Sequence, residues 1–414
     1  MKIVTFLNGL GLGGTEKAAV RWAQGLQARG HEITGLALAD GPRRAVLEQA
    51  GVPVLIAVPS AEKIAAILHQ LSPDVIHAHA PGQPHLGDVL GAALKLQPKI
   101  PVVQTNVFGR LENPAEDGWT DFRLFISWTS CVQAARRAGR KLDASFFRRT
   151  SVAVYPLDPL APAPAAEIAA FRKKCGVADD EILFGRLSRP EPNKWTPLAL
   201  TAFQKAATQN RKIKLLLREP PPAVAEKLRA SPDAGRFVIL PATADAAELR
   251  LTMSALDVAL HTSSMGESFG YGIAEPMNLG KPVITHSLPW GDQAQIELVR
   301  HGEGGFVAST TRTMADAILT LANDSVLRDR MGQKARQHIR TLADPAVSTA
   351  RLEEILVVAA AGLDNPQATE DLACARAAAT YLDVHQFGHS LLEQIALRPF
   401  HYRVRLHQFR KNFS

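Results

Sequence analysis

Short apolar runs rich in β-branched residues alternate with helix-like runs along most of the 414-residue chain. Strands that alternate with helices are typical of βαβ units, which build parallel sheets covered by helices on both faces. The alternation occurs over residues 2–155 and again over residues 182–300, and after residue 311 the pattern is helical throughout. The sequence therefore predicts an α/β protein with two Rossmann-like, doubly wound domains and a helical C-terminal tail.

A proline-rich run separates the two alternating regions. Four prolines occur among the nine residues from Pro156 to Pro164, and such a run forms neither a helix nor a central strand. We therefore predict a first domain over residues 1–160, a second domain over residues 165–345 and a helical tail over residues 346–414. Ligands of doubly wound sheets bind beyond the carboxyl ends of the strands, so we expect the site in the cleft between the domains.

The composition excludes several classes of protein. Hydrophobic residues make up 46% of the chain and charged residues 21%, as in ordinary globular proteins, and no apolar run is long enough to predict a transmembrane helix. Three widely spaced cysteines and a start that does not resemble a signal peptide predict a protein of the reducing cytoplasm. The net charge of +7 is compatible with an anionic partner such as a nucleotide, a lipid surface or a nucleic acid.

A glycine-rich loop joins the first predicted strand to the first predicted helix. Glycines allow close approach to a ligand, and the N–H groups at a helix start favour a phosphate. The loop therefore predicts a phosphate contact near Gly13 and Gly14. Gly9, Gly11 and Gly14 also spell G-x-G-x-x-G, which leaves a nicotinamide-dependent oxidoreductase as an alternative. The match is imperfect because Asp40 lies 26 residues beyond Gly14, whereas this motif has its ribose-binding acid about 20 residues on.

Two glutamates lie eight residues apart between two predicted strands of the second domain. Glu267 falls where a loop meets a helix, and Glu275 lies about two turns further on, toward the same side of the helix. A carboxylate accepts two hydroxyl hydrogen bonds at once, which suits a vicinal diol of a sugar or a ribose. Gly270 and Gly272 lie between the glutamates and leave backbone N–H groups available to a ligand at the helix start.

The run from Glu267 to Glu275 resembles the E-x7-E motif of glycosyltransferase family 4, whose members are retaining enzymes of the GT-B fold. The flanking sequence Glu275-Pro276-Met277 is also similar to that family. The resemblance covers residues 1 to about 345. It implies two Rossmann-like domains that face a cleft, and a last helix that crosses back onto the first domain, which we expect of residues 346–414.

The resemblance implies a hexosyltransferase that moves a sugar from a nucleoside-diphosphate sugar to a hydroxyl acceptor, with retention at the anomeric carbon. Such a reaction would serve the biosynthesis of a glycan, a glycolipid or another glycoconjugate. Glu267 is expected to bind hydroxyls of the donor sugar, and Glu275 the ribose diol. The other residues implied in donor binding are Gly13, Gly14, Arg186, Arg189, Lys194, Ser268, Phe269, Gly270 and Tyr271.

Basic residues follow the predicted strand over 182–187. In family 4 an arginine and a lysine at this place hold the donor diphosphate, and such cations stabilise the charge that grows on a leaving group. Lys194 matches the lysine, while Arg186, in its Gly-Arg context, and Arg189, at the usual spacing, both stay open as the arginine. Because the sequence has no D-x-D pair, these cations would replace a metal, and we expect neither a metal nor a cofactor.

One predicted site residue departs from the family pattern. Members of family 4 often carry a histidine that faces the reacting sugar at the end of the strand that corresponds to residues 101–105, and here Asn106 occupies that place. Asparagine can hydrogen-bond a hydroxyl but cannot act as a base, and we assign Asn106 to the reacting centre. We expect the nearby His77 and His79 to lie on opposite faces of their strand, which argues against a metal site.

Two basic, partly aromatic segments suggest peripheral contact with the cytoplasmic face of a membrane. Nucleic-acid contact is a lesser alternative. The first segment contains Arg136, Arg137, Arg140, Lys141, Phe146, Phe147, Arg148 and Arg149, and the second contains Arg398, Tyr402, Arg403, Arg405, Leu406, Phe409, Arg410, Lys411 and Phe413. These segments leave a non-catalytic binder of anions or nucleic acids as an alternative. A GT-B sugar-nucleotide epimerase, which needs no acceptor, is a separate alternative.

Overall fold

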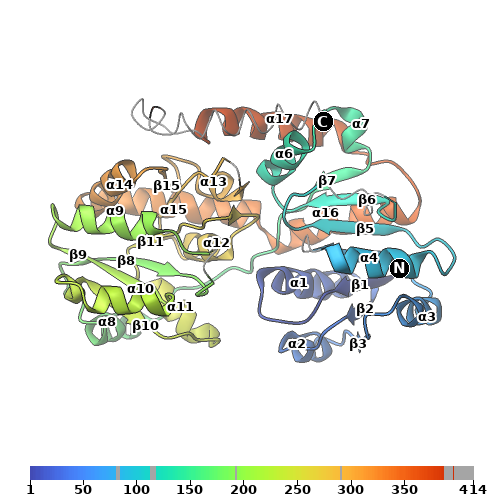
Figure 1. Ribbon diagram of the computed structural model, residues 1–414, viewed down its shortest axis with the longest axis horizontal. Helices are drawn as coiled ribbons and strands as arrows, with labels where there is room; N and C mark the ends of the chain where they lie inside the picture. Colours follow the sequence, from blue (N-terminus) through green and yellow to red (C-terminus); the bar gives the residue numbers. More distant parts are fainter. Residues whose placement is uncertain (81–83, 112–117, 192–193, 290, 387–394, 396–414) are drawn as a thin grey trace. The chain divides into compact units, whose positions relative to one another are not determined.

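The protein forms two compact units in its computed structural model (Figure 1). The structure describes residues 1–80, 84–111, 118–191, 194–289, 291–386 and 395. Within this part of the chain, unit 1 comprises Met1–Pro156 and Ala343–Thr380, and unit 2 comprises Leu157–Leu342, residues 381–386 and residue 395.

Unit 1 contains a seven-stranded sheet in the order β3-β2-β1-β4-β5-β6-β7, and every neighbouring pair is parallel. Its strands are β1 (Lys2–Leu7), β2 (Glu32–Ala37), β3 (Val54–Ile56), β4 (Val75–Ala80), β5 (Val102–Asn106), β6 (Phe122–Phe125) and β7 (Thr150–Val152). All five residues of β5 are buried, as are the last five of β1. Such continuous burial is typical of parallel strands whose sheet is covered on both faces.

Helices of unit 1 connect successive strands. They are α1 (Gly14–Ala28), α2 (Arg43–Gln49), α3 (Ala61–Leu71), α4 (Pro84–Leu94), α6 (Trp128–Arg137) and α7 (Ala144–Phe147). α3 shows the local logic, because the Ser60 hydroxyl caps its first turn and Ile64, Ala65 and Leu68 form its buried stripe. The short helices α2 and α7 are missing from the sequence-based expectation, since neither is long enough to show a helical period.

The chain returns to unit 1 through α16 (Pro345–Ala360), which packs on α1. The Trp22 indole donates a 2.8 Å hydrogen bond to the Ser348 hydroxyl. The two helices approach closely at Gly25, where an added Cβ would lie 2.6 Å from Oγ1 of Thr349. Residues 343–360 are thus part of the core of unit 1, and α17 (Ala368–His385) follows them.

Unit 2 contains a six-stranded parallel sheet in the order β10-β9-β8-β11-β13-β15. Its strands are β8 (Ile182–Leu187), β9 (Ile213–Arg218), β10 (Phe237–Leu240), β11 (Val258–Leu260), β13 (Val283–Thr285) and β15 (Gly305–Val307). A separate two-stranded ribbon pairs β12 (Gly266–Glu267) with β14 (Asp292–Gln293). The carboxyl ends of the parallel strands meet at one edge, where ligands of such sheets bind.

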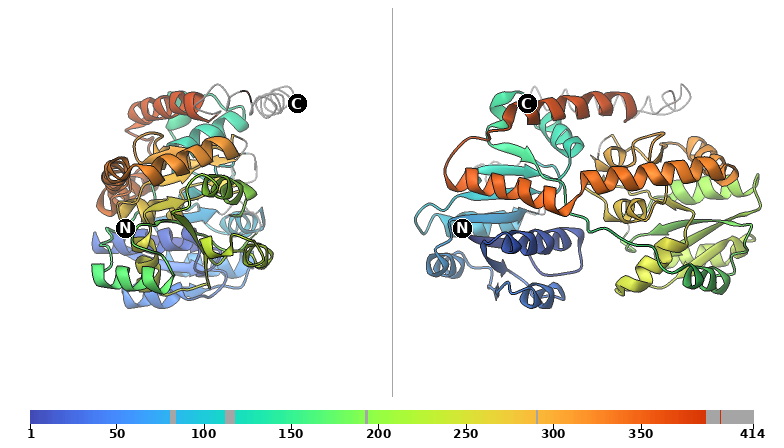
Figure 2. Two further views of the ribbon diagram at one scale, coloured as in Figure 1. Left: turned by 90° about the vertical axis from the view of Figure 1, so that its left-hand side faces the viewer. Right: turned by 180° about the vertical axis from the view of Figure 1, so that it is seen from behind.

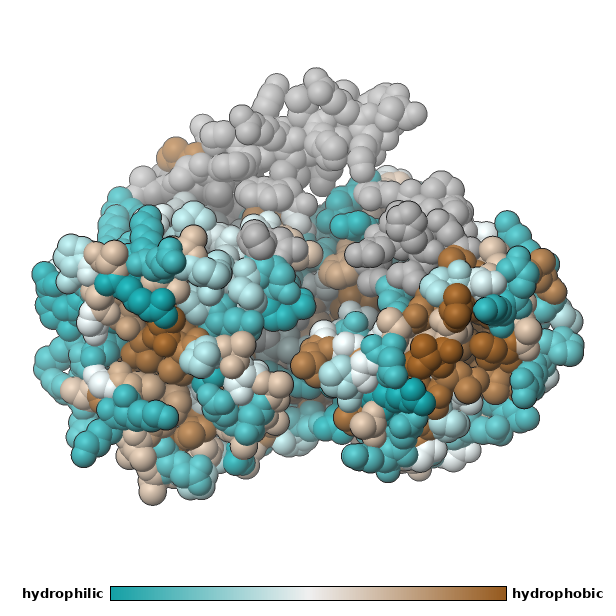
Figure 3. Space-filling model, turned by 60° about the horizontal axis from the view of Figure 1, so that its bottom comes forward, coloured by the Kyte–Doolittle hydropathy of each residue, from teal (hydrophilic) through white to brown (hydrophobic). Residues whose placement is uncertain are grey.

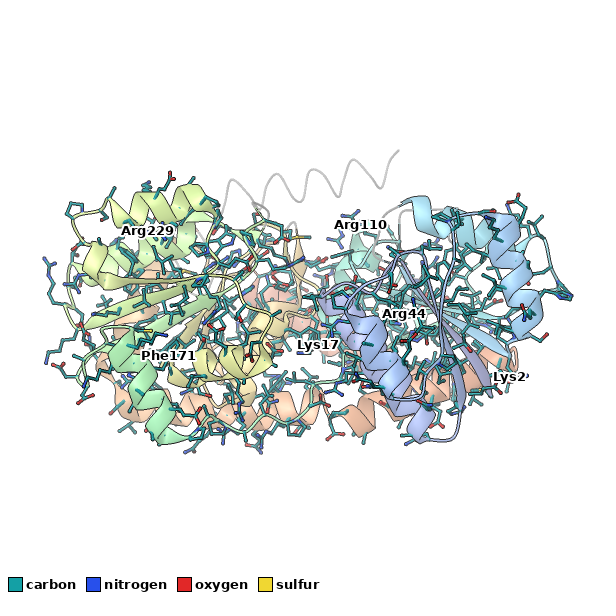
Figure 4. All side chains as sticks on the ribbon, turned by 90° about the horizontal axis from the view of Figure 1, so that it is seen from below. Lys2, Lys17, Arg44, Arg110, Phe171 and Arg229 are labelled. Carbon is teal, nitrogen blue, oxygen red and sulfur yellow. The ribbon has the colours of Figure 1, made fainter. Side chains whose placement is uncertain are left out.

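Helices cover both faces of the sheet of unit 2, and Figure 2 shows the same layering in each unit. They are α8 (Ala165–Lys174), α9 (Pro197–Ala207), α10 (Pro222–Arg229), the 3-10 helix η2 (Ala234–Arg236), α11 (Ala246–Ala255), α12 (Tyr271–Asn278), α13 (Ala294–Val299), α14 (Thr311–Asn323) and α15 (Ser325–Leu342). On one face Phe203 of α9 meets Phe184 of β8 edge-on, with ring centroids 6.2 Å apart. Phe171 of α8, labelled in Figure 4, belongs to a separate apolar cluster around Leu183 and Leu216.

The structure confirms the predicted fold class of two doubly wound, parallel-sheet α/β domains followed by helices. Residues 156–164 contain no helix or strand, as their prolines predict, and the division between the units falls between Pro156 and Leu157.

The outer strand of unit 1 carries exposed apolar side chains. Leu55 and Ile56 of β3, Val58 beyond it and Val46 of α2 are each more than a third exposed, and Figure 3 shows apolar surface gathered over this unit. β3 has only three residues, and short edge strands offer little backbone for pairing with another chain.

Candidate functional site

An ion pair lies at the carboxyl edge of the sheet of unit 2. Nζ of Lys194, in the loop after β8, lies 3.0 and 3.2 Å from the two carboxylate oxygens of Glu267. The side chain of Glu267 is 11% exposed and that of Lys194 is 21% exposed. The structure therefore brings together two residues that the sequence analysis assigned separately. Lys194 precedes β11 in the chain, and Glu267 follows it.

A third group, His261, completes this cluster. His261 directly follows β11, and its Nε2 lies 3.0 Å from Oε1 of Glu267. The ring packs against the start of α12, since a Cβ at Gly272 would lie in ordinary contact, 3.5 Å from two ring atoms of His261. The sequence analysis did not assign His261. Its position at the carboxyl end of a predicted strand, six residues before Glu267, was the available signal.

The charges of the cluster follow from burial and contact. Burial alone would raise the pKa of Glu267, but the hydrogen bond from His261 and the charges of His261 and Lys194 outweigh it and lower that pKa to about 2. Burial lowers the pKa of His261, and the nearby Arg186 and Lys194 lower it further, while Glu267 opposes them. At neutral pH Glu267 is therefore a carboxylate and His261 a neutral imidazole.

Arg186 of β8 lies behind Lys194. Its guanidinium stacks 4.1 Å above the ring of Trp195, donates a 3.0 Å hydrogen bond to Oγ1 of Thr262 and donates another to the backbone oxygen of Lys194. Burial lowers the pKa of Arg186 to about 9, against the charge of Glu267, so the group remains a cation at neutral pH. Arg186 thus fixes the segment that carries Lys194.

Arg189, the other candidate for the diphosphate contact, is in a different setting. Its side chain is 64% exposed and pairs with Glu191 at 3.1 Å. Its backbone oxygen accepts a 2.7 Å hydrogen bond from the indole of Trp195. The structure therefore separates the two arginines by burial: Arg186 belongs to the buried cluster and Arg189 lies at its surface.

The backbone before α12 holds Glu267 in place. Gly266 has φ of +76°, and a Cβ there would lie 2.0 Å from the carbonyl oxygen of Asp292. The Ser268 hydroxyl donates to the Asp292 carboxylate at 2.7 Å, and Gln295 accepts the backbone N–H of Glu267 at 3.0 Å. Only glycine suits position 266, because the left-handed conformation and the close contact both exclude a side chain.

The remaining predicted donor-binding residues of unit 2 lie at the start of α12. Gly270 caps the helix with φ of +97°. Phe269 is buried, and its ring meets that of Tyr271 with centroids 5.0 Å apart. Glu275 is half-buried one turn further along α12. The structure therefore collects Ser268 to Tyr271 around one helix start, next to Glu267.

The predicted residues of unit 1 lie at the carboxyl edge of its own sheet. Gly13 caps α1 and Gly14 is the first residue of that helix, while Asn106 is the last residue of β5. The Asn106 side chain is buried and binds the backbone of Arg110 at both ends of its amide, accepting the N–H at 2.9 Å and donating to the carbonyl oxygen. In this state Asn106 therefore holds the turn after β5.

The glycine loop rests on a residue that the sequence analysis did not single out. A Cβ at Gly41 would lie 2.3 Å from the carbonyl oxygen of Leu10, which also accepts the N–H of Arg43 at 3.0 Å. Asp40, the acid of the oxidoreductase alternative, pairs with Arg44 at 3.0 Å; Arg44 is labelled in Figure 4.

The expectation for His77 and His79 is wrong. Their ring centroids lie 4.3 Å apart on the same face of β4, because residues two positions apart on a strand share a face. Both rings are buried against Trp22. Burial lowers the pKa of His77 to about 3 and that of His79 well below its usual value. Within the described ranges, no group of three or more His, Cys, Asp and Glu side chains could hold a metal ion.

The first basic segment is partly built into unit 1. Phe147 is fully buried and meets Phe146 edge-on, with centroids 5.0 Å apart, and Arg149 pairs with Asp364 at 3.1 Å. Across the described part of the chain, no helix combines the length and apolarity needed to cross a bilayer. The predicted residues of the second segment, from Arg398 to Phe413, lie outside the described residues. Membrane and nucleic-acid contact stay predictions.

Two family models match the chain, one in each unit. Residues 13–163 match the model described as glycosyl transferase 4-like domain. Residues 167–338 match the model described as glycosyl transferases group 1, and this region contains Lys194, His261 and Glu267. A comparison with curated protein sequences finds no match.

Several solved structures share the fold. HepE from Anabaena, solved in complex with UDP, is 21% identical with a TM-score of 0.70, over 86% of this chain and 100% of that one. A glycosyltransferase from Rickettsia africae is 15% identical with a TM-score of 0.71, over 86% and 98%. WaaG, a glycosyltransferase involved in lipopolysaccharide biosynthesis, is 13% identical with a TM-score of 0.61, over 86% and 99%.

These matches favour sugar transfer over the oxidoreductase and the non-catalytic binder. The family models span both sheets, and the shared fold extends over most of the chain. Together, the two domain matches and the shared architecture identify the chain as a glycosyltransferase of the GT-B fold.

Proposed function

We propose that the protein is a retaining, family 4 hexosyltransferase that uses a nucleoside-diphosphate sugar and a hydroxyl acceptor. The half-buried pair of Glu267 and Lys194 carries this proposal. It places an acceptor of sugar hydroxyls beside a cation for phosphate, at the carboxyl edge of the sheet that matches glycosyl transferases group 1. HepE, which shares the fold, was solved with UDP and with UDP-glucose, so UDP is the first nucleotide to test.

In this proposal the residues of unit 2 act on the two halves of the donor. Glu267 accepts hydrogen bonds from sugar hydroxyls, and Glu275 from the ribose diol. Lys194, supported by the buried cation of Arg186, balances the negative charge that grows on the diphosphate as it leaves. The start of α12, near Gly270, adds the positive end of a helix dipole for the same anion.

The transfer itself needs no protein nucleophile. The bond from the anomeric carbon to the diphosphate breaks, and the bond to the acceptor oxygen forms on the same face of the sugar. The acceptor proton passes to the leaving phosphate oxygen. Gly13, Gly14 and Asn106 would contact the substrates from unit 1. Because Lys194 and Arg186 supply the positive charge, we propose that the reaction requires no metal ion. We also propose that the protein is cytoplasmic and contacts a membrane peripherally.

The first test is calorimetric titration of the full chain with UDP, GDP, ADP, CDP and NADH, in EDTA and then in magnesium. We expect one nucleoside diphosphate to bind, with the same affinity under both conditions. Binding of NADH alone would favour the oxidoreductase, and a strict need for magnesium would contradict the role given to the two cations.

The second test is the variant Glu267→Gln, which removes the charge of the carboxylate and keeps its shape. We expect a loss of transfer of about 100-fold or more, as when a single group that stabilises a transition state is removed. The control is Glu303→Gln, whose side chain is 55% exposed and lies 3.8 Å from Arg300; it should transfer like the wild type. Wild-type turnover by Glu267→Gln would overturn the assignment.

A further inference from the structure

Lys194 contacts both carboxylate oxygens of Glu267, which are the atoms that a donor sugar would use. An ionised carboxylate has about four acceptor positions. Lys194 takes one on each oxygen, at 3.0 and 3.2 Å, and His261 takes a further one on Oε1. The sugar can therefore bind Glu267 fully only when Lys194 gives up at least one of its two contacts.

A diphosphate is suited to draw Lys194 away. The ammonium group sits on a flexible four-carbon stem, and a diphosphate offers it more negative charge than one carboxylate does. Arg186 cannot follow, because its guanidinium is stacked on Trp195 and bonded to Thr262. When Lys194 moves, Glu267 becomes a buried anion with one cation fewer in contact, which is unfavourable unless another group supplies the charge.

We propose that His261 is a positioning residue that takes up a proton when a nucleoside diphosphate draws Lys194 from Glu267. The imidazolium would then hold the carboxylate in place for the donor sugar. This inference rests on the proposed function, because it assumes that Lys194 binds the donor diphosphate. The proton comes from the solvent, and no covalent bond changes in this step.

The surroundings of His261 set the direction of the proton transfer. Three groups act on its ring: Glu267 of β12, Arg186 of β8 and Lys194 after β8. His261 itself acts on a further imidazole, that of His286 after β13. Lys194 and Arg186 oppose protonation, so departure of Lys194 and arrival of a negative diphosphate both raise the pKa of His261.

His286 is the other imidazole near the cluster, and it is a weaker candidate. Its ring is 4% exposed, and burial together with the charges of His261 and Arg186 lowers its pKa to about 3. His261 has the direct 3.0 Å contact with Glu267, so it gains most from carrying a proton.

The test is calorimetric titration of the full chain with UDP, GDP and ADP in turn, at pH 7.0, in HEPES, PIPES and Tris. The slope of binding enthalpy against the ionisation enthalpy of the buffer counts the protons exchanged. The nucleotide phosphate also exchanges protons, so the decisive quantity is the difference between the wild type and His261→Gln. The glutamine can still donate to Glu267 but cannot be protonated.

We expect the wild type to take up about half a proton or more beyond His261→Gln, and its affinity to rise more on lowering the pH from 8 to 6. His286→Gln should behave like the wild type. Equal slopes for the wild type and His261→Gln would overturn the inference and leave the proposed function intact. If no nucleotide binds, the proposed function fails and the inference with it.

A second measurement covers the case in which His261→Gln does not fold. In Lys194→Met the pKa of His261, followed by NMR of the imidazole without ligand, should lie about one unit above its wild-type value. An unchanged pKa would show that Lys194 does not hold His261 neutral, and would overturn the inference.

Discussion

One cluster of titratable side chains in unit 2 and one in unit 1 differ in the charge that they carry. Unit 2 buries Glu267 as an anion, with Lys194 and His261 in contact and Arg186 close by. Unit 1 buries His77 and His79 side by side as neutral rings. Burying a charge is costly unless it is paired. The paired charges of unit 2 are therefore poised for chemistry, whereas the histidine pair of unit 1 is buried without charge.

The histidine pair of unit 1 is enclosed by the element that returns from the far end of the chain. Both rings contact Trp22, whose indole is bonded to Ser348 of α16. His77 has one partner, the Thr105 hydroxyl at 2.7 Å, and the ring nitrogens of His79 have no hydrogen-bond partner among the described residues. Among the described residues, none raises the pKa of either ring.

The largest effect is expected where the backbone holds the charged site. Gly266→Ala should lower the free energy of unfolding of unit 2 by about 3 kcal/mol or more, because it combines left-handed strain with a contact of 2.0 Å. Gly302→Ala is the matched control, with φ of +81° and nothing within 4 Å, and should cost about 1 kcal/mol. Urea unfolding, monitored by hydrogen exchange of peptides from each unit, measures the loss of stability in both variants. Equal losses of unfolding free energy in the two variants would show that the backbone at Asp292 shifts to admit the added Cβ at little cost.

An intermediate effect is expected from acid, and it should separate the buried histidines from Glu267. The pKa of His77 is lowered from 6.5 to about 3, so the stability linked to it is fully present above pH 6.5 and declines as the pH falls toward 3. The decline approaches 1.4 kcal/mol per pH unit for one histidine. The pKa of Glu267 is lowered from 4.5 to about 2, so its contribution persists down to pH 4.5 and declines below that.

Hydrogen exchange at pH 7.5 and pH 5.0, corrected for the intrinsic rates, checks this order. Peptides from β4 and peptides that contain His286 should lose protection at pH 5.0, because burial lowers the pKa of His77 and of His286 to about 3. His77→Gln should flatten the pH dependence of unit 1, whereas His69→Gln, at an exposed position of α3, should leave it unchanged. Loss of protection around β12 at a higher pH than in β4 would contradict this order.

The smallest effect is expected at a surface ion pair of unit 1. Glu353 of α16 contacts Arg29 at 2.5 Å and His31 at 2.7 Å, and its side chain is 21% exposed. Pairs near the surface contribute little, so Glu353→Gln should lower the free energy of unfolding by less than about 1 kcal/mol. Thermal unfolding in low and high salt measures it, with Glu370→Gln, in the first turn of α17, as the control. A loss above about 2 kcal/mol would mean that this contact anchors α16.

The period of the sequence was enough to predict most of the sheet-forming runs. β1, β8 and β10 lie within the two regions where strand-like and helix-like runs alternate, residues 2–155 and 182–300. Each is a short apolar run between turn-forming residues. The pattern missed β12 and β14, which have two residues each. Their pairing depends on Gly266 lying against Asp292, a contact between residues 26 positions apart that no local pattern records.

The candidate site divides in the same way. The sequence selected Glu267 as an acceptor of hydroxyl hydrogen bonds, and the resemblance to family 4 implied that Lys194 binds the diphosphate. They did not indicate that the two side chains are in contact, or that His261 shares an oxygen with Lys194. For His77 and His79 the prediction was wrong, since it overlooked that alternate residues of a strand share a face.

The sequence by itself determined that the chain forms two parallel α/β units, because strand and helix periods are local and repeat along the chain. It also determined which residue types could act on a sugar nucleotide. Only the tertiary structure decided which charges are buried and which are neutralised. Burial and distance depend on side chains that meet across the fold, and they set the pKa values of Glu267, His261 and His77.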